Sequence, residues 1–116
     1  MEKPKKNTFF EIDGIKIGSD YKPVVIAEIG INHAGSLDVA KQMVDSAERA
    51  GIKIVKHQTH IASEEMSQAA KKIVPIHTNK NIFEIIDNCS LSEGEEYELL
   101  NYFKDKGMVF MSTPFS

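Results

Sequence analysis

The sequence is short of the features that would mark several classes of protein. It contains one cysteine, Cys89, so no disulfide can form within the chain, and this is typical of a reducing compartment. No apolar run approaches the roughly 20 residues that a membrane helix needs, and the first residues lack the apolar core of a signal peptide. The net charge of -3 leaves no basic surface for nucleic acid. We therefore expect a cytoplasmic protein with neither a nucleic-acid partner nor a membrane partner.

The pattern of apolar residues predicts an α/β protein. The 116 residues suit one small domain or part of a larger one, after a polar start at residues 1–7 that we expect to be flexible. Asp13-Gly14 between two short apolar runs is typical of a β-hairpin turn. The predicted order is hairpin (9–17), strand (24–30), helix (36–51), strand (52–58), a long connection that includes a helix (63–73) and a loop (75–80), helix (92–107) and strand (108–112).

Repeated strand–helix units of this kind build parallel sheets. Right-handed crossovers between parallel strands lead either to a doubly wound sheet or to a (β/α)₈ barrel, and three strands complete neither. Both architectures place their functional residues at the carboxyl ends of the strands. Candidate site residues are therefore expected at the ends of the three predicted strands.

Polar side chains occur at those strand ends where apolar ones would be expected. Because side chains alternate along a strand, Glu28, Lys56, Gln58 and Thr113 are predicted to share one face of the sheet. An ionised carboxylate among apolar residues is costly unless it is paired, and Lys56 is the natural partner of Glu28. One interpretation is an ion pair that only satisfies itself, but such a pair contributes little net stability, which favours a functional site. Gln58 and Thr113 are equally explained by hydrogen bonds to loop backbone.

The four histidines raise the question of a metal site. His57 and His60 lie three positions apart, so on an extended segment they point to opposite faces and make a poor pair of ligands. His33 follows the first strand directly, where it can contact a ligand or fix the turn before Ser36. We predict no metal site among these residues.

Three motifs resemble the N-acetylneuraminate (sialic acid) synthase family, in its bacterial form. They are Ala27-Glu-Ile-Gly-Ile-Asn-His33 with Gly35-Ser36, then Lys56-His-Gln-Thr-His-Ile61, and finally Ser112-Thr-Pro-Phe-Ser116. The order and spacing of the motifs are intact, and the likeness extends from the hairpin to residue 116. The form Lys-His-Gln-Thr-His is similar to synthases for N-acetylneuraminate and for the related sugar legionaminate.

The resemblance implies a fold and an activity. Family members are homodimers with an N-terminal (β/α)₈ TIM-type barrel and a C-terminal antifreeze-like domain, and they need a divalent metal such as Mn²⁺ or Mg²⁺. They condense phosphoenolpyruvate with N-acetylmannosamine and release phosphate. Residues 8–116 would then be the hairpin and first three strands of an incomplete barrel, with the antifreeze-like domain and the metal ligands outside this chain.

The resemblance also implies roles for individual residues. Glu28 would lie near the reacting carbons as a catalytic residue. Lys56 would bind the phosphoenolpyruvate carboxylate, Thr113 would contribute to the phosphate site and Gln58 would lie beside the acceptor sugar. These assignments agree with the face that alternation alone predicts for the four side chains.

One loop departs from the family pattern. Where members carry a Pro-Gly-Asn element whose Asn contacts the sugar, this chain reads Pro75-Ile-His-Thr-Asn79, so His77 takes the matching position and Asn79 follows two residues later. Both are candidate sugar-binding residues, and the acceptor is open between N-acetylmannosamine and the precursor of legionaminate or another nonulosonate. Two further alternatives are an inactive truncated fragment and a plain phosphate-binding α/β module, although no Gly-rich phosphate loop is present.

Overall fold

The computed structural model describes Met1 and residues 8–116, and the flexible start predicted for residues 1–7 falls almost entirely outside them. The hairpin prediction is confirmed: β1 (Phe9–Ile12) pairs antiparallel with β2 (Ile15–Gly18). The turn residues Asp13 and Gly14 have φ values of 46° and 81°. Two positive φ values match the twist of the flanking strands, which explains the Asp-Gly pair.

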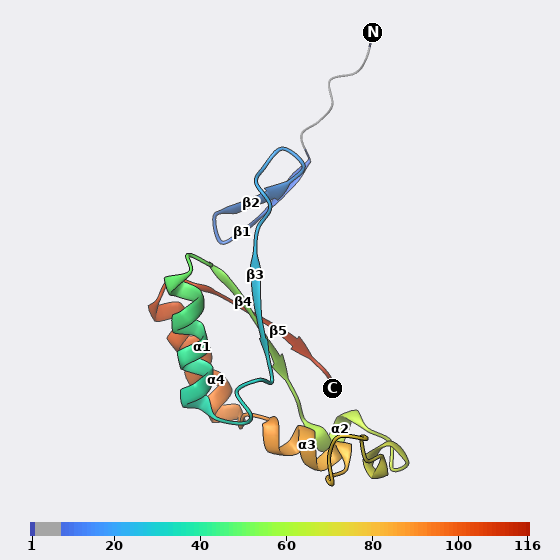
Figure 1. The fold of residues 1–116 in the computed structure, drawn as a ribbon. Coiled ribbons are helices and arrows are strands. Elements are labelled where there is room, and N and C mark those ends of the chain that lie inside the picture. Colours follow the sequence, from blue (N-terminus) through green and yellow to red (C-terminus); the bar gives the residue numbers. More distant parts are fainter. Residues whose placement is uncertain (2–7) are drawn as a thin grey trace.

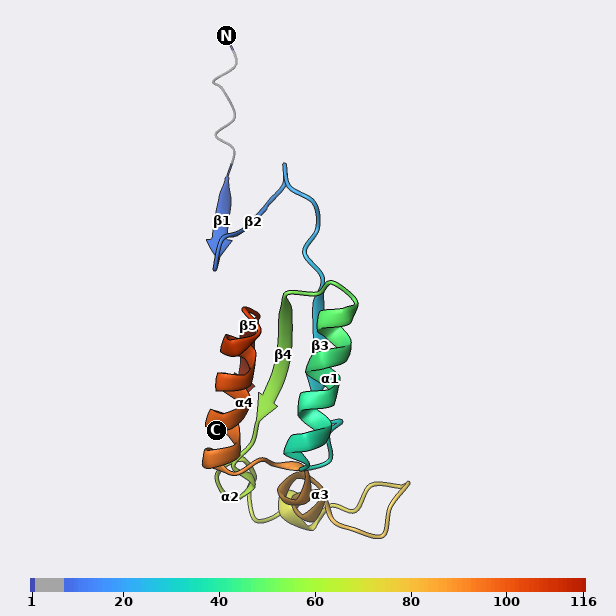
Figure 2. The same cartoon turned by 90° about the vertical axis from the view of Figure 1, so that its left-hand side faces the viewer.

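The main sheet is parallel and has the order β3-β4-β5. Its strands are β3 (Ile26–Gly30), β4 (Ile54–Thr59) and β5 (Val109–Pro114). The hairpin lies beyond the amino ends of these strands, and the long connection lies beyond their carboxyl ends (Figures 1 and 2). The α/β class predicted from the sequence is confirmed, and the central strand β4 carries neighbours on both sides.

Two helices cover the same face of this sheet (Figure 1). They are α1 (Leu37–Arg49) and α4 (Glu93–Asp105), and each begins at a capping serine as the sequence predicts. Ser36 accepts a hydrogen bond from the Val39 amide, and Ser92 forms a reciprocal capping box with Glu95. We call the side under the helices the covered face and the other side the open face.

The hydrophobic core lies between the covered face and the two helices. Strand residues on this face, such as the register partners Val55 on β4 and Phe110 on β5, pack with the apolar stripes of α1 and α4. Phe103 is fully buried and meets the Phe110 ring edge to face, with centroids 5.1 Å apart. The buried cluster comprises Ile29, Ala40, Val44, Ala47, Val55, Leu91, Leu99, Phe103 and Met108.

The connection between β4 and α4 differs from the prediction. The single helix expected over residues 63–73 is wrong: the structure has α2 (Ala62–Glu65) and the short 3₁₀ helix η1 (Ala70–Lys72), with Met66 extended between them at φ -128° and ψ 139°. The Ser67 hydroxyl accepts a hydrogen bond from the Ala70 amide, and this local bond competes with a continuous helix. Helix α3 (Ile82–Cys89) then starts at a capping box formed by Asn81 and Glu84. None of the helices in the described residues is long and apolar enough to cross a membrane.

Candidate functional site

Glu28 and Lys56 meet on the open face near the carboxyl edge of the sheet. They are register partners on β3 and β4, and Lys56 Nζ lies 3.0 Å from Glu28 Oε2. The other carboxylate oxygen, Oε1, accepts a hydrogen bond of 2.9 Å from the Gly30 amide. Both oxygens of the acid are therefore engaged, one by a cation and one by the backbone of its own strand.

A bulge in β3 makes the backbone contact possible. Glu28 pairs with Lys56 and Gly30 pairs with His57, so Ile29 is an extra residue between two consecutive positions of β4. Gly30 has φ +51°, a left-handed conformation that glycine adopts without steric cost. Bulges of this kind redirect side chains, and here the bulge turns the Gly30 amide back toward Glu28.

The expectation that Glu28 is buried among apolar residues is wrong for the described residues. The side chains of Glu28 and Lys56 keep 44% and 36% of their exposure, and neighbouring Ile26 is 44% exposed. Water therefore solvates both charges, because α1 and α4 lie on the opposite face of the sheet. A half-exposed ion pair contributes at most about 1 kcal/mol to stability, so its charges are free to serve a ligand.

Gln58 and Thr113 also lie on the open face, as predicted. They are register partners on β4 and β5, one alternation beyond Lys56. Gln58 Oε1 lies 3.0 Å from His60 Nε2, so its partner is a side chain and not the loop backbone. Both residues are half-buried. The structure thus brings Glu28, Lys56, Gln58 and Thr113 to one edge of one face.

The two loop candidates lie apart from this group. His77 and Asn79 are exposed on the segment between η1 and α3, which extends away from the sheet in Figure 2. Within the described residues, neither takes part in the hydrogen bonds that link Gln58, His60 and Glu65. Their predicted role in sugar binding stays a prediction.

His33 and His57 form a buried pair on the covered face. Their Nε2 atoms lie 3.2 Å apart, and the rings are 1% and 0% exposed. Because His33 Nδ1 accepts a hydrogen bond from the Gly35 amide, a neutral His33 carries its proton on Nε2 and donates it to His57. Of the two roles predicted for His33, fixing the turn is the one that the structure shows.

The protonation of this pair follows from its surroundings. With Nε2 accepting, His57 carries its proton on Nδ1, which faces Glu96 Oε2 at 3.4 Å. Burial is the largest effect on both histidines: it lowers the pKa of His57 to about 4, with His33 and His60 adding to the shift, and it lowers the pKa of His33. Burial also raises the pKa of Glu96. The histidines are thus neutral at pH 7, and their contacts are structural.

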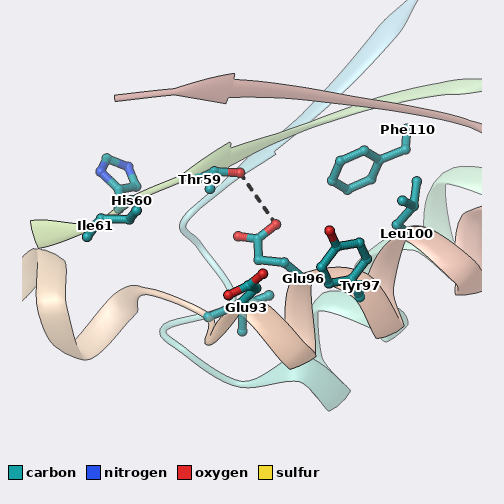
Figure 3. A pocket seen from close by; sticks show the side chains of 9 residues that line it. Thr59, His60, Ile61, Glu93, Glu96, Tyr97, Leu100 and Phe110 are labelled. Carbon is teal, nitrogen blue, oxygen red and sulfur yellow. Dashed lines mark hydrogen bonds between the residues drawn. The ribbon is translucent and has the colours of Figure 1, made fainter. Parts of the chain in front are cut away.

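A pocket of about 300 Å³ lies beside this pair, between α4 and the ends of β4 and β5. Figure 3 shows Glu96 pointing toward Thr59, whose hydroxyl donates to Glu96 Oε2 at 3.4 Å. Thr59 also contacts the Ser112 hydroxyl at 2.6 Å. Tyr97, Leu100 and Phe110 supply an apolar wall. This pocket is on the covered side, and the four clustered candidates of the open face do not line it.

A metal site does not form from the residues that the structure describes. No group of three or more His, Cys, Asp or Glu side chains in this part of the chain is arranged to hold an ion. As predicted from their spacing, His57 and His60 point to opposite faces, since His57 contacts His33 and His60 contacts Gln58. These residues therefore do not fit the metal that the family resemblance implies.

Two features of the site were not predicted. The first is the contact of His60 with Gln58 and Glu65, and the second is the network of His33, His57 and Glu96. The alternation of side chains along β4 could have indicated part of both contacts, because it places His57 on the covered face and His60 on the same face as Gln58. Nothing in the spacing of Glu65 or Glu96 indicates their partners, since both belong to helices whose positions depend on the tertiary fold.

These observations define an α/β protein with a cation, an acid and an amide at the carboxyl edge of a parallel sheet. Residues 43–116 match the NeuB family, and the chain belongs to that family. Nonulosonate synthases are therefore its relatives, as the motifs at Glu28, Lys56 and Ser112 predicted.

Individual relatives cover most of this chain. The N,N'-diacetyllegionaminic acid synthase of Legionella pneumophila is 34% identical over 110 residues, which is 90% of this chain and 31% of that protein. The crystal structure of N-acetylneuraminic acid (sialic acid) synthetase from Leptospira borgpetersenii matches with a TM-score of 0.77 and 26% identity, over 95% of this chain and 35% of its own. The spore coat polysaccharide biosynthesis protein SpsE of Bacillus subtilis matches with a TM-score of 0.62 and 30% identity, over 90% and 27%.

The matches cover most of this chain but only a minor part of each relative. This chain spans about a third of the length of these relatives. The likeness to solved structures supports the α/β fold of the described residues.

Proposed function

We propose that this chain is the N-terminal part of a nonulosonate synthase that condenses phosphoenolpyruvate with N-acetylmannosamine to give N-acetylneuraminate and phosphate. The observation that carries the proposal is the grouping of Glu28, Lys56, Gln58 and Thr113 at the carboxyl edge of the open face. Membership of the NeuB family supports the class of reaction. The similarity to the Leptospira N-acetylneuraminic acid (sialic acid) synthetase supports the product.

Lys56 is proposed to bind the carboxylate of phosphoenolpyruvate. Its ammonium carries three donors, and Glu28 Oε2 occupies one of them. The compact charge of lysine suits an anionic substrate, and water reaches the site from the open face. Thr113, the register partner of Gln58 two positions beyond Lys56, is proposed to donate its hydroxyl to the phosphate.

Glu28 is proposed to act on the carbon that becomes electron-poor. When C3 of phosphoenolpyruvate forms its bond to the aldehyde carbon of the sugar, positive character develops at C2. A nearby carboxylate stabilises that charge and orients the water that adds to C2, after which the C–O bond to phosphate breaks. The Gly30 amide and Lys56 hold both oxygens of Glu28, so the acid is oriented before the substrates bind.

The acceptor sugar is proposed to bind beside Gln58. The amide offers a donor and an acceptor, as the hydroxyl and amide groups of an N-acetylated sugar require. His77 and Asn79 are proposed as further contacts from the exposed loop, which would have to approach the open face when the sugar binds.

The remaining parts of the active site are proposed to lie outside residues 8–116. They include the ligands of a divalent metal, Mn²⁺ or Mg²⁺, which would supply Lewis-acid chemistry to the site. In this proposal β3, β4 and β5 are the first strands of a (β/α)₈ barrel, and the open face is its interior. The partner subunit of a homodimer and an antifreeze-like domain would complete the enzyme.

A legionaminate synthase is the second candidate. It uses the same reaction and differs only in the sugar. The observation in its favour is the 34% identity to the Legionella enzyme, together with the departure at Pro75-Ile-His-Thr-Asn79. The residues that hold phosphoenolpyruvate serve both candidates equally.

The test is phosphate release by the full-length natural chain that contains these residues. Phosphoenolpyruvate, Mn²⁺ and each candidate sugar are supplied in turn, and the product is identified by mass. Release with N-acetylmannosamine supports the proposal, and release only with the diacetylated sugar supports the second candidate. The absence of phosphate release with every candidate sugar would contradict both.

The 116 residues alone are expected to be inactive. Both outer strands of the parallel sheet have one unpaired edge, and the open face is half-exposed, so the substrates would not be enclosed. Turnover by the purified 116-residue chain at more than about 1% of the full-length rate would contradict this expectation.

A further inference from the structure

The connection from β3 to α1 is a run of hydrogen-bonded turns, residues 31–36, which we call the turn segment. Its first bond joins the Asn32 amide to the Ile29 carbonyl, and its last joins the Ser36 amide to the His33 carbonyl, both at 3.0 Å. Ile29 is the extra residue of the β3 bulge, and Ser36 is the N-cap of α1. The turn segment therefore connects the bulge to the start of a helix on the covered face.

The turn segment has a backbone conformation that a side chain stabilises. Ala34 has φ +52°, in the left-handed region that is unfavourable for a residue with a Cβ, and Gly35 follows with φ +80°. The Gly35 amide donates a hydrogen bond of 3.1 Å to Nδ1 of His33. A Cβ built on Gly35 would clash with the carbonyl oxygen of Asn88, so the segment also packs closely against the end of α3. The ring of His33 thus holds the strained part of the turn segment from within.

The hydrogen bond to Gly35 depends on which nitrogen of His33 carries the proton. A backbone N–H only donates, so Nδ1 accepts and the proton of the neutral ring lies on Nε2. That Nε2 lies 3.2 Å from Nε2 of His57, which accepts in turn and carries its own proton on Nδ1. In the opposite tautomer of His33, an N–H at Nδ1 would face the N–H of Gly35. His57 therefore selects the tautomer in which His33 can hold the turn segment.

The burial of His57 is costly for the fold. Its ring is fully buried, and Nδ1 faces Glu96 Oε2 at 3.4 Å without a hydrogen-bond partner among the described residues. An unsatisfied buried donor destabilises a protein, and an apolar side chain would pack beside Phe110 without that cost. What the imidazole contributes beyond an apolar ring is the acceptor for His33. This contribution indicates a role other than stability.

One peptide group connects the turn segment to the acid on the open face. The Ile29 carbonyl, which accepts from the Asn32 amide, and the Gly30 N–H belong to the same planar peptide unit. That Gly30 N–H donates to Glu28 Oε1 at 2.9 Å. Gly30 is also the register partner of His57 on β4. Fixing the turn segment therefore fixes the direction of the N–H that orients Glu28.

We propose that His57 is a positioning residue for Glu28 and acts through His33 and the turn segment. The inference rests on the proposed function and adds to it a residue from the covered face of the sheet. Without an acceptor at position 57, the proton of His33 can move to Nδ1, the Gly35 amide loses its partner, and the peptide that holds Glu28 can rotate. Lys56 lies outside this series of contacts, so the binding of phosphoenolpyruvate does not depend on it.

The experiment is steady-state kinetics of the full-length natural chain with two substitutions at position 57. His57→Phe keeps a buried ring but removes the acceptor, and we expect kcat to fall about tenfold with both KM values within about twofold. His57→Gln restores an acceptor for His33 and is expected to keep kcat within about threefold of the unsubstituted protein. Val44→Ala is the matched control, because Val44 on α1 is fully buried in the same core. The control is expected to lower the unfolding midpoint and to leave kcat unchanged.

A double variant tests whether His57 acts only through His33. The side chain introduced by His33→Asn can accept from the amide two residues later through its oxygen, which does not depend on a tautomer. Adding His57→Phe to His33→Asn is therefore expected to change kcat by less than about twofold. An equal loss from His57→Phe in both backgrounds would overturn the inference.

Three results of the single variants also overturn the inference. They are an unchanged kcat in His57→Phe, a loss in His57→Gln as large as that in His57→Phe, and an equal loss in Val44→Ala. If His57→Phe does not fold, His57→Leu replaces it, because leucine also lacks an acceptor, and the same fall in kcat is expected.

A second measurement separates this inference from the proposed function. If the unsubstituted protein releases no phosphate with any sugar, the proposed function fails, and nitrogen-edited NMR of the same protein then tests the contacts by themselves. The imidazole signals are expected to show the proton of His33 on Nε2 and that of His57 on Nδ1. The Gly30 amide signal is expected to move in His57→Phe and to stay in place in Val44→Ala. The opposite tautomers, or an unmoved Gly30 signal in His57→Phe, overturn the inference.

Discussion

The two faces of the parallel sheet use the same strands for opposite purposes. On the covered face, β4 contributes Val55 and His57, which are fully buried. On the open face, the same strand contributes Lys56 and Gln58, which keep part of their exposure. Under the helices, His33 and His57 contact each other and His57 Nδ1 faces Glu96 without forming a hydrogen bond, whereas Lys56 on the open face pairs with Glu28 and remains accessible to water. Stability is therefore expected to depend on the covered face and chemistry on the open face.

The largest expected effect tests the covered face. Phe103→Ala removes a fully buried ring that contacts Phe110, and substitutions of this kind cost about 3–5 kcal/mol. Urea unfolding followed by circular dichroism measures the loss. Tyr97→Ala on the exposed side of α4 is the control, because that side chain is 61% exposed, and it is expected to cost less than about 1 kcal/mol. Equal costs would contradict the division between the faces.

The next prediction tests the open face. Lys56→Ala removes the proposed partner of the phosphoenolpyruvate carboxylate, and we expect kcat/KM for phosphoenolpyruvate to fall about a hundredfold in the full-length natural chain. The unfolding midpoint should change little, because the ion pair with Glu28 is half-exposed. Lys53→Ala, an exposed lysine just before β4, is the control. An enzyme that keeps its activity without Lys56 would refute the assignment.

The histidine pair predicts a loss of stability in acid. The pKa of His57 is about 4 in the folded protein and about 6.5 in the unfolded chain. Between pH 6.5 and pH 4 the ring of His57 is protonated in the unfolded chain but not in the folded protein. The free energy of unfolding therefore falls as the pH drops through this range. This effect amounts to about 2 kcal/mol between pH 7.5 and pH 5. The depressed pKa of His33 acts in the same direction, and the raised pKa of Glu96 acts against it.

Urea unfolding at pH 7.5 and at pH 5 measures how much of the loss of stability in acid is due to His57. His57→Gln removes the titrating ring but keeps an acceptor for His33, and it should flatten the dependence on pH. His77→Gln replaces an exposed histidine and should leave the dependence unchanged. Identical slopes in the two variants would mean that the buried pair does not cause the acid sensitivity.

The smallest effect concerns the start of α4. Ser92→Ala removes the side chain that accepts from the Glu95 amide, and such caps contribute about 1 kcal/mol. The exposed Ser19 lies outside any helix, so Ser19→Ala is the control in thermal unfolding. If Ser92→Ala unfolds at the same temperature as Ser19→Ala, the capping box does not stabilise the helix that covers the sheet.

Local chemistry explains which parts of the fold were predictable. The Asp13-Gly14 turn and the serine caps of α1 and α4 are signals within a few residues, and all were confirmed. Alternation also placed Glu28, Lys56, Gln58 and Thr113 on one face, because a strand leaves its side chains no other arrangement. The break at Met66 was missed, since the serine that competes with the helix resembles an ordinary helical residue.

The environment of the site could not be predicted from the same signals. The exposure of Glu28 depends on what covers the open face, and no periodicity within β3 contains that information. The contact between His60 and Glu65 likewise depends on how α2 folds back against the end of β4. Sequence patterns therefore indicated which residues meet, and the fold determined how they are solvated and oriented.

The bulge at Ile29 has a consequence for how this site can change. One extra residue in β3 lets the main chain itself, through the Gly30 amide, orient the carboxylate of Glu28. That amide belongs to the main chain, but the φ of +51° at position 30 is one that a residue with a Cβ adopts only with strain, so the hydrogen bond depends on glycine at this position. The orientation of the acid therefore constrains position 30 to glycine, whereas the other side chains of the open face are not constrained by this hydrogen bond.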